Sequence, residues 1–151
     1  MRIEITRADP RAPDLRRLIG DLDAYQQALY PAESNHLLDI DALARPEMHF
    51  FACALDGRLV GCGGVWMHGD YAEVKRVYVA PDARGLGLSR KIMAALEADA
   101  VAHGATLARL ETGIHQPEAL GLYRALGYTV RPSFGDYPVD DPMSVFMEKA
   151  L

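Results

Sequence analysis

The chain has 151 residues, of which 50% are hydrophobic and 25% charged, a composition typical of a folded globular protein rather than a disordered one. This length suits one hydrophobic core, so we expect a single domain over residues 1–151. The formal net charge of −5 argues against broad nucleic-acid binding, which needs a basic surface. No apolar run is long enough to cross a bilayer and no apolar signal segment opens the chain, so we expect a cytoplasmic protein that binds neither nucleic acid nor membrane.

The first half of the chain predicts a strand, a helix and a three-stranded meander. From Leu15 to Leu29 apolar residues recur at three- and four-residue intervals, Tyr25 among them, which predicts an amphipathic helix that stops at Pro31. A polar connection follows, with room for a second short helix. Two apolar runs then flank Asp56-Gly57, a strong hairpin signal. The predicted strands of this half cover residues 2–6, 49–55, 58–67 and 71–80.

The second half of the chain alternates helices and strands. Ile92, Leu96 and Ala100 stand at fourfold spacing in a predicted helix over residues 89–103, which Gly104 ends. Because this helix is a crossover, the next strand should run parallel to the one before it. The remaining elements are strands at 106–112, 128–130 and 144–149 and a helix at 117–126. The order predicts a mixed α/β (α+β) fold, with a seven-stranded, mostly antiparallel sheet, one parallel pair (its fourth and fifth strands) and about four flanking helices.

The cysteines and histidines suggest neither a disulfide nor a metal site. Cys53 and Cys62 fall within apolar runs, so we expect buried free thiols. The five histidines are scattered, and no group of Cys or His stands at ligand spacing. We therefore expect no metal.

The segment Val77 to Arg90, VYVAPDARGLGLSR, places two glycines between a predicted strand and a predicted helix. Exposed backbone N–H groups and the helix dipole favour an anion at such a junction. A P-loop needs four residues between its glycines and then Gly-Lys-Ser or Gly-Lys-Thr, which this segment lacks. A dinucleotide fingerprint is also disfavoured, although Glu111 superficially suits its ribose-binding acid, because Arg90 stands where helix packing requires glycine.

Residues 84–89 read RGLGLS, and residues 116–128 read QPEALGLYRALGY. Together they resemble the Q/R-x-x-G-x-G/A and N-x-x-A-x-x-L-Y-x-x-x-G-F signatures of the GNAT family of acyl-CoA-dependent N-acetyltransferases. Ser89 replaces the usual Gly or Ala, Gln116 the usual Asn and Tyr128 the usual Phe. The predicted element order also matches the GNAT fold over nearly the whole chain.

The resemblance implies acetyl-CoA as co-substrate. The glycine loop would bind the pyrophosphate, and the backbone of Val77 and Val79 would hold the pantetheine arm in a gap between diverging strands. Backbone N–H groups near Tyr78 and Val79 would form the oxyanion hole. The expected cofactor-binding residues are Val77, Tyr78, Val79, Arg84, Gly85, Leu86, Gly87, Leu88, Ser89, Gln116 and Tyr123.

Catalysis needs a base, because a primary ammonium with a pKa of roughly 8 to 10.4 is mostly protonated at pH 7. Glu73 lies 11 residues before Arg84, and Glu111 lies 5 residues before Gln116. Family members carry a general base at either spacing, although each glutamate can also be a solvated strand-end acid. Glu73 is the preferred candidate. Tyr123 stands where the family places a tyrosine that protonates the departing CoA thiolate.

The acceptor is expected between two polar loops, at residues 34–36 and 132–142. Lys75 and Arg76 are either anchors for an acceptor carboxylate or plain surface charges on a strand. His115 is either a second base or an exposed loop histidine.

The predicted reaction moves an acetyl group from acetyl-CoA to a primary amine of a small molecule or peptide. Direct attack in a ternary complex is favoured, because no cysteine has a motif position suited to an acyl-enzyme. The alternative is a non-catalytic acyl-CoA-binding or sensing domain. The resemblance also allows a homodimer, although no residue marks an interface.

Overall fold

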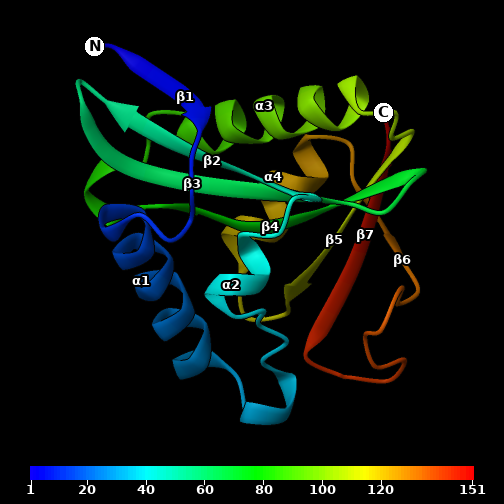
Figure 1. The fold of residues 1–151 in the computed structure, drawn as a ribbon. Helices are drawn as coiled ribbons and strands as arrows, with labels where there is room; N and C mark the ends of the chain where they lie inside the picture. Colours follow the sequence, from blue (N-terminus) through cyan, green and yellow to red (C-terminus); the bar gives the residue numbers. More distant parts are fainter.

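Seven strands form one sheet in the order β1-β2-β3-β4-β5-β7-β6 (Figure 1). The computed structural model describes residues 1–151. The strands are β1 (Ile3–Arg7), β2 (Met48–Leu55), β3 (Arg58–Met67), β4 (Tyr71–Val79), β5 (Leu107–Gly113), β6 (Thr129–Arg131) and β7 (Ser144–Ala150). Only β4 and β5 pair in parallel, and every other neighbouring pair is antiparallel. The predicted fold class is therefore confirmed.

Helices cover both faces of this sheet (Figure 1). They are α1 (Pro13–Leu29), α2 (Ile40–Leu43), α3 (Leu88–Ala102) and α4 (Pro117–Ala125). On one face α1 and α2 bury Leu18 and Leu43 against Phe50, in a core cluster of 7 buried residues. On the other face α3 and α4 contribute Ile92 and Tyr123 to a larger cluster of 19. None of the helices has the length and apolar character that a membrane span requires.

Local sequence explains most of these elements. The predicted hairpin turn forms between β2 and β3, because Asp56 and Gly57 both take positive φ angles, 49° and 83°, as a tight hairpin turn needs. The expected apolar face of α1 is buried at Leu15, Leu18, Ile19 and Leu22. Tyr25 is an exception, since it is 46% exposed instead of buried.

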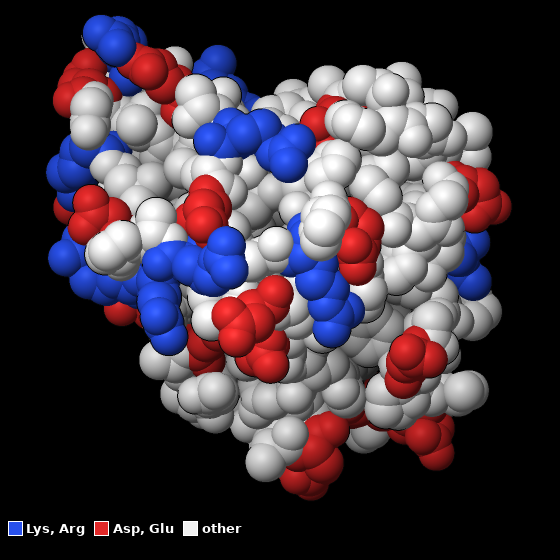
Figure 2. Space-filling model, viewed as in Figure 1, with Lys and Arg blue, Asp and Glu red and all other residues white.

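On the face drawn in Figure 2, acidic and basic side chains are interspersed.

The parallel pair β4 and β5 separates after a short shared segment. Only three residue pairs form the ladder, and the last of them joins Glu73 to Arg109. Further along β4, Arg76 takes a left-handed φ of 53° and the register with β3 shifts, which marks a β-bulge. Bulges bend and twist the strand that carries them. The remainder of β4, up to Val79, therefore has no strand partner on the β5 side, as the predicted pantetheine gap requires.

Candidate active site

A cleft of about 590 Å³ lies between the end of β4, the loop before α3, and α4. Every predicted cofactor-binding residue lines it except Leu86, which is 41% exposed. Tyr25 and Leu22 of α1 also border the cleft. The periodicity of α1 predicts that Tyr25 is buried with the apolar face of the helix, and this was wrong, because Tyr25 borders the open cleft and is 46% exposed.

Two glycines give the loop before α3 its shape. Gly85 and Gly87 have φ angles of 84° and 74°, in the left-handed region that side chains disfavour. Gly87 is the N-cap of α3, so no side chain caps the first turn, and that turn contains no acidic residue. The helix begins at Leu88, one residue earlier than predicted. Its free N–H groups and positive dipole end are thus available to an anion in the cleft, which Leu88 and Ser89 line.

The side chain of Arg84 links this loop to the end of β4. Its Nε donates a hydrogen bond to the carbonyl oxygen of Val79 over 3.0 Å. Its guanidinium carbon lies 5.6 Å from the centre of the Tyr78 ring, within the range of a cation–π contact. The cation therefore stays at the rim of the cleft, beside the strand expected to hold pantetheine.

Tyr123 of α4 borders the cleft from the opposite side and is only 8% exposed. Burial raises the pKa of its phenol to about 12, and the negative charge of Glu111 acts in the same direction. A phenol with this pKa stays protonated at neutral pH. Its hydroxyl can therefore donate a hydrogen bond or a proton to a group in the cleft.

A second, smaller cavity of about 30 Å³ lies beside the cleft, and Gln116 lines both. Glu111 faces this cavity, where it accepts a hydrogen bond from the hydroxyl of Ser144 over 2.8 Å. Burial raises the pKa of the Glu111 carboxyl, although the Ser144 hydrogen bond opposes the shift. A raised pKa makes a carboxylate a stronger base.

Tyr30, which the sequence analysis did not assign to the site, forms one wall of the small cavity. Its hydroxyl donates to Gln116 Oε1 and accepts from the backbone N–H of His115, each over 3.1 Å. A Cβ on Gly113 would lie 1.8 Å from the Tyr30 oxygen, so this close approach requires glycine. The exposed His115 ring stacks on Tyr30 with ring centres 5.5 Å apart.

Glu73 lies in a different environment from Glu111. It is 3% exposed and lines neither cavity. The Tyr137 hydroxyl donates to its carboxylate, Lys75 Nζ lies 2.8 Å away, and Lys75 also donates to the Tyr137 oxygen over 2.5 Å. His68 Nε2, a buried atom without a hydrogen-bond partner, lies 3.7 Å from the carboxylate, and burial lowers the pKa of His68. Glu73 is thus one member of a buried ion-pair cluster.

Lys75 and Arg76 are not surface charges, since each is only 8% exposed, and that interpretation was wrong. Arg76 Nε donates to Asp23 of α1 over 2.8 Å, and a terminal nitrogen donates to the Leu38 carbonyl over 2.5 Å. The side chain therefore ties α1 and the segment before α2 to the bulge in β4. Both cations are held by acceptors of the protein itself.

Asp141 joins the two loops that were predicted to flank the acceptor. Its carboxylate lies 2.8 Å from His36 Nε2 and accepts from the Ser34 hydroxyl over 3.0 Å. It also accepts from the Met143 backbone N–H over 2.9 Å, and this bond, with those from His36 and Ser34, lowers the pKa of Asp141. The predicted meeting of these loops is confirmed, and the small cavity includes Ser34, Asn35 and His36.

Comparisons with known proteins agree with this geometry. Residues 15–128 match the Acetyltransferase (GNAT) family. A relative from Azospirillum brasilense named IAA acetyltransferase is 43% identical over 151 residues, which cover 99% of this chain and 98% of the relative. The crystal structure of a candidate acyl-CoA N-acyltransferase from Klebsiella pneumoniae has a TM-score of 0.84 at 38% identity and covers 99% of this chain and 97% of that one.

A more distant structure shows the same fold. The PaiA N-acetyltransferase of Thermoplasma acidophilum, solved in complex with coenzyme A, has a TM-score of 0.74 at 18% identity, with 100% of both chains covered. The chain therefore belongs to the GNAT acetyltransferase family. It is an acyl-CoA-dependent N-acyltransferase, and the family uses acetyl-CoA as the acetyl donor.

Proposed function

We propose that this enzyme transfers the acetyl group of acetyl-CoA to a primary amine of a small molecule or peptide, by direct attack in a ternary complex. The observation that carries the proposal is the shared wall at Gln116 between a cleft sized for a cofactor and a cavity that holds a carboxylate. Donor and acceptor would meet at this wall.

The cleft would hold the donor mainly through backbone groups. Its pyrophosphate would lie against the N–H groups of residues 85–89, at the positive end of α3. The pantetheine arm would add to the unpaired edge of β4 near Val77 and Val79, much as another strand would. The acetyl carbonyl would then lie near backbone N–H groups of Tyr78 and Val79, the proposed oxyanion hole.

Glu111 is the base that the geometry supports. It faces the small cavity and its pKa is raised by burial, whereas Glu73 is held by Lys75 and Tyr137 outside both cavities. In the proposed step Glu111 takes a proton from the ammonium, directly or through a water, and the cavity of about 30 Å³ has room for one. The neutral nitrogen then attacks the thioester carbon and forms a C–N bond, and the extra proton that this nitrogen carries passes to solvent.

Tyr123 is placed to assist the second half of the reaction. As the C–S bond breaks, sulfur takes the electron pair, and the Tyr123 hydroxyl donates its hydrogen bond or proton to the resulting thiolate. Neither cysteine suits an acyl-enzyme intermediate, because Cys53 and Cys62 are both fully buried. Burial also raises the pKa of the Cys62 thiol to about 12, so no thiolate forms there at neutral pH.

The test measures thiol release from acetyl-CoA across a panel of primary amines. Wild type should turn over at least one amine, while Glu111→Gln and Tyr123→Phe should lower turnover, and Glu111→Gln should leave acetyl-CoA affinity unchanged. Glu47→Gln, a substitution of an exposed glutamate, is the matched control. Full activity in both site variants would remove the roles assigned to Glu111 and Tyr123.

A further inference from the structure

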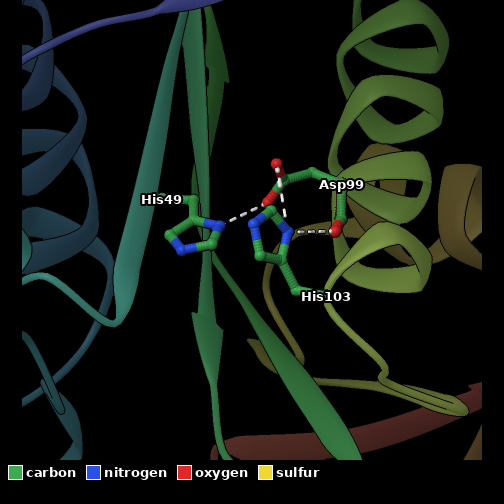
Figure 3. Close-up of side chains that lie close together, drawn as sticks. All are labelled: His49, Asp99 and His103. Carbon is green, nitrogen blue, oxygen red and sulfur yellow. Dashed lines mark hydrogen bonds and ion pairs between the residues drawn. The ribbon is translucent and has the colours of Figure 1, made fainter.

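His49, Asp99 and His103 gather at the C-terminal end of α3 (Figure 3). His49 comes from β2, whereas Asp99 lies in the last turn of α3 and His103 is its C-cap. Asp99 stands twelve positions after Gly87 along the helix, which at about 1.5 Å rise per residue amounts to roughly 18 Å. This cluster is therefore distinct from the active site.

Hydrogen bonds already orient all three side chains. His49 Nδ1 lies 2.5 Å from Asp99 Oδ2, and because an ionised carboxylate only accepts, the proton belongs to the imidazole. His103 Nδ1 lies 2.8 Å from the Asp99 backbone oxygen and 3.6 Å from its Oδ1. The two imidazole rings have centres 4.5 Å apart and an interplanar angle of 69°.

We propose that His49, Asp99 and His103 form a binding site for a divalent transition metal ion, for which Zn²⁺ is the best match. Two imidazoles and one carboxylate are a donor set that zinc uses, with a water in the fourth position. One ligand atom from each residue already lies within 4.8 Å of the others. Zinc bonds of about 2.1 Å at tetrahedral angles place ligand atoms about 3.4 Å apart. The widest pair must therefore close by up to about 1.4 Å, while His49 Nδ1 and Asp99 Oδ2, now 2.5 Å apart, must separate by about 0.9 Å.

The cluster can make this adjustment without moving the backbone far. Asp99 and His103 stand at i and i+4, the spacing that puts two side chains on one helix face and that helical zinc motifs use for paired ligands. The side chain of His103 is 48% exposed, so its ring is free to turn toward the ion. Those of His49 and Asp99 are only 10% and 14% exposed, which leaves two ligands fixed by packing and one side open to water.

Binding would replace the hydrogen bond between His49 and Asp99 by two bonds to the metal. Nδ1 of His49 would bind the ion through its lone pair, with the ring proton of the neutral imidazole then on Nε2, and Asp99 would supply a carboxylate oxygen. The bound ion would join β2 to the end of α3. It would stabilise the folded chain according to its concentration and affinity, since the unfolded chain holds no preformed site.

The direct test is calorimetric titration of the tag-free protein with ZnCl₂. Wild type should bind one equivalent, and Asp99→Asn and His103→Ala should each weaken binding at least tenfold. Asparagine keeps an oxygen that accepts from His49, so Asp99→Asn retains that hydrogen bond while removing the charged ligand. His115→Ala is the matched control, because it removes an exposed histidine that lies outside the cluster and should leave the zinc affinity unchanged.

Absorption spectroscopy with Co²⁺ is a second measurement, and it keeps the proposal testable if Asp99→Asn fails to fold. Co²⁺ should give the visible absorption of a tetrahedral site in wild type, and this signal should be lost in His103→Ala, whose exposed side chain is not needed for folding. The proposal is overturned if wild type binds no stoichiometric zinc. It is equally overturned if Asp99→Asn and His103→Ala bind as wild type does, since the cluster would then be only a hydrogen-bonded link between β2 and α3.

Discussion

The donor cleft and the acceptor cavity, named for the roles proposed for them, are built in different ways. The cleft is open, about 590 Å³, and most of its lining comes from two short stretches, residues 77–90 and 116–123. The acceptor cavity is about 30 Å³ and is lined by side chains from α1, the loop after it, β5 and the segment before β7. In the proposed function the cleft binds acetyl-CoA mainly through backbone groups, whereas the shape of the cavity depends on how side chains from distant parts of the sequence meet.

This difference determines which changes each half tolerates. A backbone site should be sensitive to glycine replacements and indifferent to most side-chain changes. A side-chain site should lose function when one polar group is replaced by a near-isostere. Four substitutions probe this contrast between a backbone site and a side-chain site, in order from the largest expected effect to the smallest.

Glu111→Gln should have the largest effect. Removal of a general base lowers turnover by about 10²–10⁴-fold, because the acceptor amine must then lose its proton unaided. In wild type, kcat/KM should fall as the pH drops through the raised pKa of Glu111, since protonation removes the base. In the variant this limb of the pH profile should disappear, while the dissociation constant for acetyl-CoA should stay within about twofold. If kcat/KM of the variant still falls at acidic pH as it does in wild type, another group is the base.

Glu73→Gln should act on stability more than on chemistry. It leaves the Lys75 ammonium buried without its counter-ion, and breaking a buried pair costs about 3–5 kcal/mol. Urea unfolding measures this loss. The double variant Glu73→Gln with Lys75→Met is the control, and it should recover much of the stability because neither charge of this pair remains buried. If Glu73→Gln instead unfolds as wild type does but turns over a thousandfold more slowly, Glu73 is the base.

These glutamates show where sequence reasoning reaches its limit. Elements whose causes are local were predicted closely: Asp56-Gly57 forms its hairpin turn, and the bounds of α3 differ by one residue at each end. The motif spacings indicated both Glu73 and Glu111, with Glu73 as the preferred base, whereas the geometry favours Glu111. Their difference comes from Tyr137, which lies on the late loop and pairs with Glu73 across 64 residues of chain. No periodicity or spacing encodes such a contact.

The same limit applies to His49 and His103. Their separation along the chain gave no sign of a shared site, because sequence spacing does not show which residues the fold brings together. Sheet and helix packing brings them to one point with Asp99. Tyr25 shows the opposite error, since it fits the apolar period of α1 but faces an open cleft. Periodicity predicts which face of a helix is apolar, but it does not show which residues on that face are covered by the rest of the fold.

Gly87→Ala tests the backbone character of the donor cleft. An alanine at φ 74° is strained by about 1–2 kcal/mol even though no atom lies within 4 Å of the added Cβ. We expect about tenfold weaker binding of acetyl-CoA, measured by calorimetry. Gly69→Ala is the matched control, because Gly69 has a similar φ of 86° and equally open surroundings but lies in the turn before β4. It should lose similar stability and keep its affinity for acetyl-CoA.

Asp141→Asn should have the smallest effect and belongs to the acceptor half. Asparagine can still accept from Met143 and Ser34 but loses the charge beside His36, which we expect to cost about 1 kcal/mol. The folded-state pKa of Asp141 is lowered, so its contribution is fully present above the unfolded value of about 3.9 and is lost as the pH falls through the folded value.

Urea unfolding of wild type and Asp141→Asn at pH 7 and pH 3 measures this dependence. The difference in unfolding free energy should shrink at the lower pH, because the wild-type carboxyl is then increasingly protonated and resembles the amide. The KM for the amine should rise while the KM for acetyl-CoA stays unchanged, because Asp141 joins only the loops of the acceptor half. A rise in the KM for acetyl-CoA as well would mean that these loops also set the shape of the cleft, and the two halves would then have to be treated as one site.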